Sequence, residues 1–208
     1  MSGVQIPPVP YVIATGADMK TSSRKEPEES GGARPVAARL LVNKVIVGRG
    51  FGELEERAFG RADGGRLELS MVESLYLSSK GKISIKKGGK EVGFRQLLED
   101  GVRLDPRLHE KYVVFADLRE RGLVVKTGFK FGCDFRVYRR GVAVKRGPKR
   151  PGEHTKWIVY VVPEDYTCAF QELSRAVRLA HSIRARMLWA VVDNEQNVTY
   201  YEVLRLKP

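Results

Sequence analysis

The chain has 208 residues, which is enough for one large or two small domains with buried cores. Its 37 Lys and Arg against 25 Asp and Glu give a net charge of +12, which favours a polyanionic partner such as nucleic acid. Two cysteines, Cys133 and Cys168, are too few for the disulfide framework of a small secreted protein, although one bridge between them stays open.

The same composition argues against a membrane or metal protein. The three histidines are dispersed, so no zinc-type ligand spacing is present. No signal peptide, spanning segment or amphipathic anchoring helix is evident. We therefore expect a cytoplasmic protein with no membrane partner, no metal and no cofactor.

The first 37 residues are expected to form a flexible arm. Pro, Gly, Ser and charged residues dominate residues 1–37, a composition that buries little apolar surface. The folded chain is expected to begin near Ala38. Residues 39–47 are dense in β-branched side chains and predict a single strand, and the glycines of residues 48–65 indicate turns around short strands.

Ser70 is expected to begin a helix. Ser70 and Glu73 have the spacing of a capping box, in which a hydroxyl and a carboxylate satisfy free backbone donors of the first turn. Gly81 lies where such a helix commonly ends. The segments that follow predict a hairpin, a short helix and a domain boundary, at residues 82–92, 94–99 and 101–105. Together these elements predict a small α/β module over residues 38–101.

Residues 102–208 predict a second domain, which makes the whole chain α/β (α+β). Asp105 and Pro106 suit the cap and first position of a helix that reaches Gly122. Apolar residues at three- and four-residue spacing predict another helix over residues 165–186. The predicted strands are residues 123–126, 130–138, 155–162, 187–193 and 198–206. We expect a mixed, mostly antiparallel sheet with helices packed on it.

Ordinary acid-base groups are the candidates for chemistry, because no P-loop or nucleophile elbow is present. Strand alternation places Asp134, Arg136 and Tyr138 on one face, with Tyr138 at a polar strand end. The connection to His154 carries six cations: Arg139, Arg140, Lys145, Arg146, Lys149 and Arg150. By pattern alone, a strand-end aromatic, a surface histidine and a solvated loop are the simpler interpretation, but the strong overall charge favours RNA contact.

Four distinctive segments follow one another in the second half of the chain. They are Tyr112-Val-Val-Phe-Ala-Asp-Leu-Arg119, Arg121-Gly-Leu-Val-Val-Lys-Thr-Gly-Phe-Lys-Phe-Gly132, Asp134-Phe-Arg-Val-Tyr138 and Arg178-Leu-Ala-His-Ser182. In this order they resemble archaeal tRNA-splicing endonucleases. The resemblance is strong over about residues 105–208 and looser over about 38–100. It implies the nuclease subunit of such an enzyme, with residues 102–208 as the C-terminal catalytic endonuclease domain.

The resemblance also implies a reaction. Family members cut precursor tRNA at bulge-helix-bulge intron junctions and leave 2′,3′-cyclic phosphate and 5′-hydroxyl ends, using a tyrosine, a histidine and a lysine and no metal. The matching positions here are Tyr138, His154 and Ala185. One group must take the proton of the attacking 2′-hydroxyl and another must protonate the leaving 5′-oxygen. Tyr138 is expected to be the base and His154 the acid.

Ala185 departs from the family's pattern. An alanine cannot neutralise the charge that grows on the phosphate in the transition state, and one such contact is worth about 3 kcal/mol, or roughly a hundredfold in rate. Either Arg184 or Arg186 substitutes for the lysine, or the activity is reduced. Because Tyr138 and His154 are both present, we favour an introduced lysine-to-alanine change over natural loss. The alternatives are a non-catalytic RNA-binding or scaffold subunit of the same assembly and a basic RNA-binding protein unrelated to splicing.

RNA and subunit contacts are implied as well. Arg178 and Arg205 match two arginines that sandwich a bulged base, although both side chains could simply be solvated. Asp193 and Glu195 match an acidic loop that enters a neighbouring subunit, in a turn that Asp and Asn favour anyway. The expected partners are precursor tRNA and other endonuclease subunits, in a homotetramer or in a heterotetramer with a structural subunit. The single Tyr-His motif argues against a fused chain.

Overall fold

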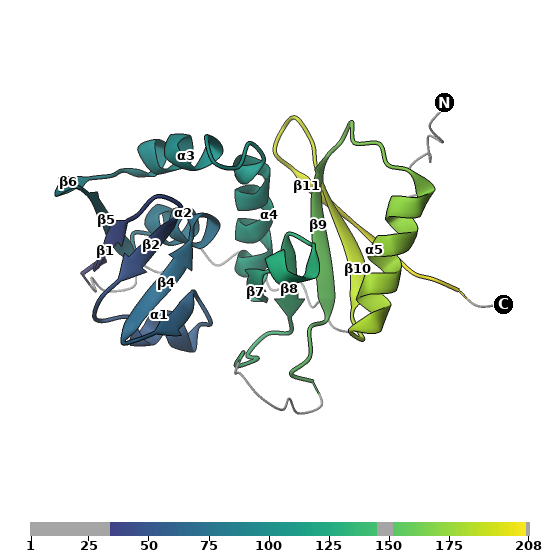
Figure 1. The fold of residues 1–208 in the computed structure, drawn as a ribbon, viewed down its shortest axis with the longest axis horizontal. Coiled ribbons are helices and arrows are strands. Elements are labelled where there is room, and N and C mark those ends of the chain that lie inside the picture. Colours follow the sequence, from purple (N-terminus) through teal and green to yellow (C-terminus); the bar gives the residue numbers. More distant parts are fainter. Residues whose placement is uncertain (1–33, 145–151, 207–208) are drawn as a thin grey trace, which may run out of the picture.

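The computed structural model describes residues 34–144 and 152–206, and within them it contains two mixed sheets and five α-helices (Figure 1). The α+β class predicted from the sequence is confirmed, with a small N-terminal module followed by a second sheet and its helices. Most of the predicted arm and the loop residues Lys145 and Arg146 lie outside the described residues.

The first sheet has six strands in the order β3-β4-β2-β1-β5-β6, and only the β1–β5 pair is parallel. Its strands are β1 (Val36–Leu40), β2 (Lys44–Val47), β3 (Arg61–Asp63), β4 (Arg66–Ser70), β5 (Ile83–Lys87) and β6 (Lys90–Glu91). The helices of this module are α1 (Gly52–Glu56), α2 (Met71–Ser79) and α3 (Phe94–Val102). Helix α2 packs on β2, β4 and β5, so alternate strand residues are buried beneath it.

The single strand predicted over residues 39–47 is wrong. The segment is a hairpin in which β1 and β2 pair antiparallel, and the Leu41 N–H donates to the Lys44 carbonyl (2.9 Å) across its turn. Strand β1 also begins at Val36, ahead of the predicted start at Ala38. The turn was not predicted because it contains the apolar residues Leu41 and Val42. A high content of β-branched residues indicates strands, but it does not show where the chain reverses between two strands.

The predicted capping box at α2 is confirmed. The Ser70 hydroxyl accepts from the Glu73 N–H (3.4 Å), and the Glu73 carboxylate accepts from the Ser70 N–H (3.0 Å). The helix ends at Ser79, and Gly81 follows with φ +63°, a left-handed conformation that glycine adopts without strain. Local chemistry therefore sets both ends of this helix.

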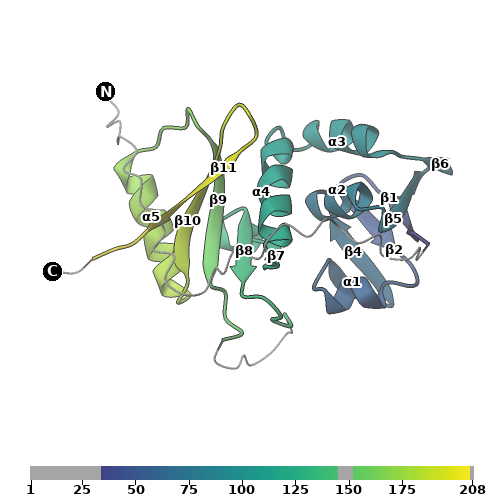
Figure 2. The same cartoon turned by 180° about the vertical axis from the view of Figure 1, so that it is seen from behind.

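The second sheet has five strands in the order β11-β10-β9-β8-β7, and only the β9–β10 pair is parallel. The strands are β7 (Val124–Thr127), β8 (Phe135–Tyr138), β9 (Trp157–Pro163), β10 (Arg186–Val192) and β11 (Val198–Val203). Helix α4 (Leu108–Glu120) packs on one face and α5 (Phe170–Ser182) packs on the other (Figure 2). The predicted mixed, mostly antiparallel sheet is confirmed.

Three predicted boundaries are wrong. Helix α5 is shorter than the predicted 165–186, because β9 runs to Pro163 and the apolar residues from Met187 onward pair with β9. The predicted strand 130–138 begins instead as a 3-10 turn, Phe129–Phe131, before β8. Helix α4 begins at Leu108 rather than at Pro106, since the Asp105 carboxylate accepts from the Arg107 N–H (3.1 Å) in a turn before the helix.

A buried polar network joins the two sheets through α4 and β7. The Glu73 carboxylate is 3 % exposed, accepts from the Gly60 N–H (2.8 Å) and lies 3.9 Å from Lys126 Nζ. Lys126 and Arg119 both donate to the Ala58 carbonyl, and burial lowers the pKa of Arg119 to about 10. These bonds supplement one continuous apolar core, so the N-terminal module is held firmly against the second sheet.

Candidate active site

A cationic pocket surrounds His154 at one end of the second sheet. Its volume is about 520 Å³, and its lining residues are Arg139, Gly152, His154, Thr155, Lys156, Arg184 and Arg186. Four of these side chains carry a full positive charge and none is a carboxylate. Such a pocket suits an anionic ligand, because the cations are not neutralised from within the lining.

The pairing of three neighbouring strands brings these residues together. Strand β8 ends at Tyr138, and the antiparallel register pairs Val137 with Trp157 at the start of β9. Strand β10 starts beside it, since the Arg186 N–H donates to the Lys156 carbonyl (3.0 Å). The connection that leaves β8 therefore returns to the same sheet end from which β10 departs.

Tyr138 and Ala185 lie on the same side of this sheet. Phe135 packs against Phe115 of α4, with ring centroids 5.7 Å apart, so Phe135 and Val137 face α4. Strand alternation directs Tyr138 to the opposite side. Ala185 packs there as well, in the apolar cluster that α5 covers.

The phenol of Tyr138 is fully buried, with 0 % of the residue exposed. Tyr138 ends β8, as predicted, but the sequence analysis did not predict that its side chain is buried. Alternation predicts on which face of the sheet a side chain lies, but not whether other residues bury that side chain. Strand β8 lies inside the sheet, between β7 and β9. His154 is exposed, as expected for a residue in a connection.

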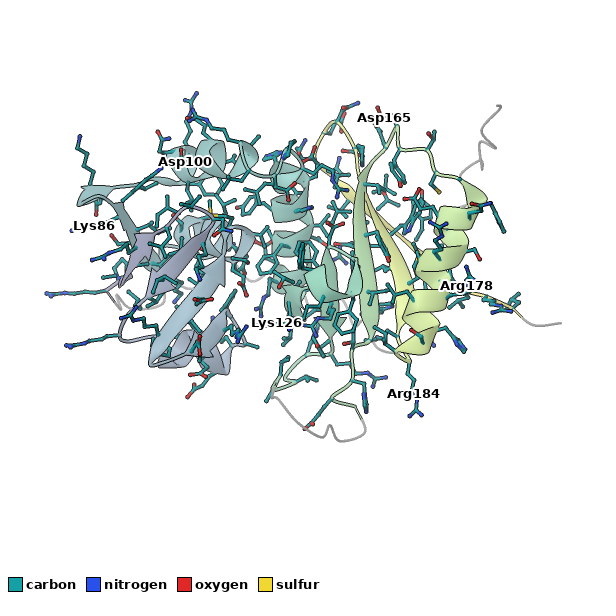
Figure 3. The ribbon with its side chains drawn as sticks, in the orientation of Figure 1. Lys86, Asp100, Lys126, Asp165, Arg178 and Arg184 are labelled. Atoms are coloured by element: carbon teal, nitrogen blue, oxygen red, sulfur yellow. The ribbon has the colours of Figure 1, made fainter. Side chains whose placement is uncertain are left out.

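The two arginines beside Ala185 have different surroundings. Arg184 is exposed and has φ +57°, at the turn between α5 and β10 (Figure 3). An Arg186 guanidinium nitrogen lies 2.9 Å from the Glu202 carboxylate, which also accepts from the Trp157 ring N–H (2.8 Å). Glu202 therefore holds Arg186 toward β11, whereas Arg184 has no such carboxylate among the described residues.

Lys156 is a pocket residue that the sequence analysis missed. The parallel register pairs Arg186 with Trp157, so extending it by one residue sets Ala185 opposite Lys156. Neighbouring strands lie about 4.8 Å apart, which places this lysine next to Ala185, the position at which the resemblance implies a lysine. Only the parallel pairing of β9 with β10 reveals this proximity, because Lys156 and Ala185 are 29 positions apart in the chain.

The predicted RNA-binding residues do not form one cluster. Arg139 lines the pocket, but Arg140 donates from Nε to the Arg121 carbonyl (2.8 Å) and so ties β8 to the end of α4. Arg178 is exposed on α5 (Figure 3). Arg205 is exposed after β11, and neither arginine lines the pocket. Lys145 and Arg146 lie outside the described residues.

The predicted interface residues lie in the hairpin turn between β10 and β11. The Asp193 carboxylate accepts from the Asn197 N–H (2.8 Å), and the Asn197 amide also donates to Glu195 (3.5 Å). Glu195 is exposed and Asp193 is half-buried. Asp193 therefore stabilises the turn through these hydrogen bonds, and the charge of Glu195 lies at the surface.

Both cysteines are free thiols, so the disulfide that the sequence left open is not formed. Cys133 is buried, and burial raises the pKa of its thiol to about 11. Within residues 34–144 and 152–206, no three His, Cys, Asp or Glu side chains are grouped to hold a metal ion. No helix in the described part of the chain is long and apolar enough to cross a membrane.

Comparison with known proteins identifies two matching families. The family described as tRNA intron endonuclease, catalytic C-terminal domain, matches residues 108–200, and its N-terminal domain counterpart matches residues 36–98. A tRNA-splicing endonuclease of Thermococcus onnurineus is 40% identical over 168 residues, covering 77% of this chain and 93% of the relative.

Two further relatives agree. The tRNA-splicing endonuclease of Thermococcus kodakarensis is 40% identical over 152 residues, covering 73% of this chain and 85% of the relative. That of Methanosarcina mazei is 40% identical over 196 residues, covering 91% of this chain but 54% of the relative. The alternative of a basic RNA-binding protein unrelated to splicing is therefore wrong. The chain belongs to the tRNA intron endonuclease family.

Proposed function

We propose that this chain is the nuclease subunit of an endonuclease that cuts precursor tRNA at bulge-helix-bulge junctions and leaves 2′,3′-cyclic phosphate and 5′-hydroxyl ends. The observation that carries the proposal is the cationic pocket in which exposed His154 lies among Arg139, Lys156 and Arg184. A scissile phosphate in this pocket would have its charge neutralised and an imidazole within reach.

The reaction needs two proton transfers and no external nucleophile. The 2′-hydroxyl attacks the adjacent phosphorus while a base takes its proton, and the P–O bond to the 5′-oxygen breaks as an acid protonates that oxygen. His154 is the acid, because it is exposed at the pocket, and Tyr138 is the base. Catalysis requires that RNA binding bring the buried phenol to the 2′-hydroxyl, since a base acts only within hydrogen-bond reach.

The pocket cations stabilise the negative charge that grows on the phosphate. Ala185 leaves this chain without the family's lysine, and Lys156 is the cation that the sheet places opposite it. Lys156 also stacks on the Trp157 ring, with Nζ 3.9 Å from the ring centroid, so it compensates only partly. The chain is accordingly an enzyme of reduced activity.

Restoring the lysine tests the proposal directly. The Ala185→Lys variant, assembled with any partner subunit, should cleave bulge-helix-bulge RNA about a hundredfold faster than the chain with Ala185, the scale of one transition-state contact. The assay is a single-turnover cleavage in EDTA, with the RNA ends identified chemically. Products with cyclic phosphate and 5′-hydroxyl ends are expected.

A second candidate, a non-catalytic subunit of the same assembly, is favoured by Ala185 alone. It predicts that the Ala185→Lys variant binds the RNA tightly and leaves it intact. A 3′-hydroxyl or a linear phosphate at the cut would also reject the proposed reaction.

We further propose that the assembly is a tetramer in which Asp193 and Glu195 enter a neighbouring subunit, and the mass of the assembly in solution tests this.

Lys156→Gln should slow cleavage by the chain with Ala185 about tenfold, because one half-buried cation contributes roughly 1 kcal/mol or slightly more. The same change in the Ala185→Lys variant should cost less than about threefold, since the restored ammonium takes over the role. The measurement is the single-turnover rate of all four chains. Equal losses in both backgrounds would show that Lys156 does not compensate for Ala185.

A further inference from the structure

The open face of the N-terminal sheet carries cations that the proposed active site does not use. Helix α2 buries one set of alternate strand residues, and the other set points away from it. A shallow hollow of about 820 Å³ lies on this face, and its lining includes Arg39, Arg66 and Lys86. Small residues such as Ala37 and Gly48 form part of the hollow between these long side chains.

Two of these cations are held side by side. The parallel register of β1 and β5 pairs Arg39 directly with Lys86. Like charges that face each other on neighbouring strands destabilise a sheet, because they are only about 5 Å apart at the backbone. Both side chains are exposed, and no carboxylate within the described residues forms an ion pair with either. A bound anion would remove this repulsion.

Three carboxylates lie beside the cations of this face, and among the described residues none forms an ion pair with Arg39, Arg66 or Lys86. Asp63 is opposite Arg66 in the β3–β4 pair. Glu68, in the neighbouring strand β4, forms an ion pair with Lys44 (2.7 Å). Glu91 is opposite Lys86 in the β5–β6 hairpin, but its carboxylate accepts from the Ser84 hydroxyl (3.2 Å) instead. The lining of the hollow itself contains three cations and no carboxylate, which suits the repeated charges of a phosphate backbone.

We propose that this face, named here the sheet-face patch and defined by Arg39, Arg66 and Lys86, binds the phosphate backbone of the substrate RNA at a distance from the scissile bond. The proposal rests on the proposed function for the identity of the RNA. Lys86 lies near one end of the long axis of the molecule, and Arg184 lies well away from it, at the foot of α5 (Figure 3). A short junction RNA bound at His154 would not reach the patch, whereas the body of a complete precursor tRNA would.

The test compares two triple variants of equal charge in the assembled enzyme. One is Arg39→Gln, Arg66→Gln and Lys86→Gln. The control removes three other exposed cations of the same module, one in β6, one on α3 and one after α3, as Lys90→Gln, Arg95→Gln and Arg103→Gln. Equilibrium binding is measured over a series of salt concentrations, with a complete intron-containing precursor tRNA and with a minimal bulge-helix-bulge RNA.

The patch variant should bind the complete precursor tRNA roughly 10- to 100-fold more weakly, and the salt slope should fall by about 3, one unit for each lost phosphate contact. Binding of the minimal RNA should change less than about threefold. The control variant should change both affinities less than about threefold. All six side chains are exposed, so neither variant is expected to unfold.

Several results would overturn the proposal. Equal losses in the two variants would mean that only net charge matters, and equal losses for the two RNAs would place the contact near the cut. If the patch variant changed the mass of the assembly, the patch would be a subunit interface. If the patch variant no longer weakened binding in a chain that lacks residues 1–33, the patch would bind these residues and not RNA. The proposed function is tested separately, because cleavage of the minimal RNA by the Ala185→Lys variant does not involve the patch.

Discussion

His154→Ala, introduced into the Ala185→Lys variant, should slow RNA cleavage by two to four orders of magnitude, the usual contribution of a positioned general acid. The reason is that the departing 5′-oxygen is a poor leaving group until it is protonated, and His154 is the exposed imidazole of the cationic pocket. The measurement is the single-turnover rate with saturating enzyme, which separates the chemical step from RNA binding.

His109→Ala is the matched control, because His109 lies on α4 and is not part of the pocket lining. It should leave the single-turnover rate within about threefold of the parent. Substrates with an activated leaving group provide a second check, since they need no protonation and should lose much less rate in His154→Ala. A loss that appears only as weaker RNA binding would assign His154 to binding and not to acid catalysis.

Glu73→Ala should lower the free energy of unfolding by about 3–5 kcal/mol, as removal of one partner from a buried charge network does. The change leaves Lys126 and Arg119 without their nearest carboxylate and removes the acceptor of the Gly60 N–H. It also removes the carboxylate half of the capping box at Ser70. Equilibrium urea unfolding, followed by circular dichroism, measures the effect.

Glu53→Ala is the control for the loss of a glutamate. Glu53 makes an exposed ion pair with Arg57 in α1 (3.6 Å), so its removal should change the unfolding free energy by about 0.5 kcal/mol or less. Glu73→Gln keeps one acceptor oxygen and should fall between the two. If Glu73→Ala and Glu53→Ala were equally stable, the network would not hold the N-terminal module to the second sheet.

Local chemistry made several elements of the fold predictable. The capping box of Ser70 and Glu73, the terminal Gly81 and the hairpin predicted within residues 82–92 depend on a few neighbouring residues, so the sequence is sufficient to place them. The hairpin inside residues 39–47 was missed, because its turn, Leu41-Val42-Asn43, is mostly apolar and its one turn-favouring residue, Asn43, was not recognised among β-branched neighbours. The length of α5 was overestimated, because strand pairing competes with helical spacing at its ends.

The sequence by itself determined the family, the face of β8 that carries Tyr138 and the basic character of the connection that leads to His154. Only the tertiary structure decided that Tyr138 is buried, that Glu202 forms an ion pair with Arg186 and that Lys156 lies opposite Ala185. The physical reason is range. Alternation and capping depend on residues close in the chain. The burial of a side chain, and its distance from residues on other strands, depend on which distant strands pair.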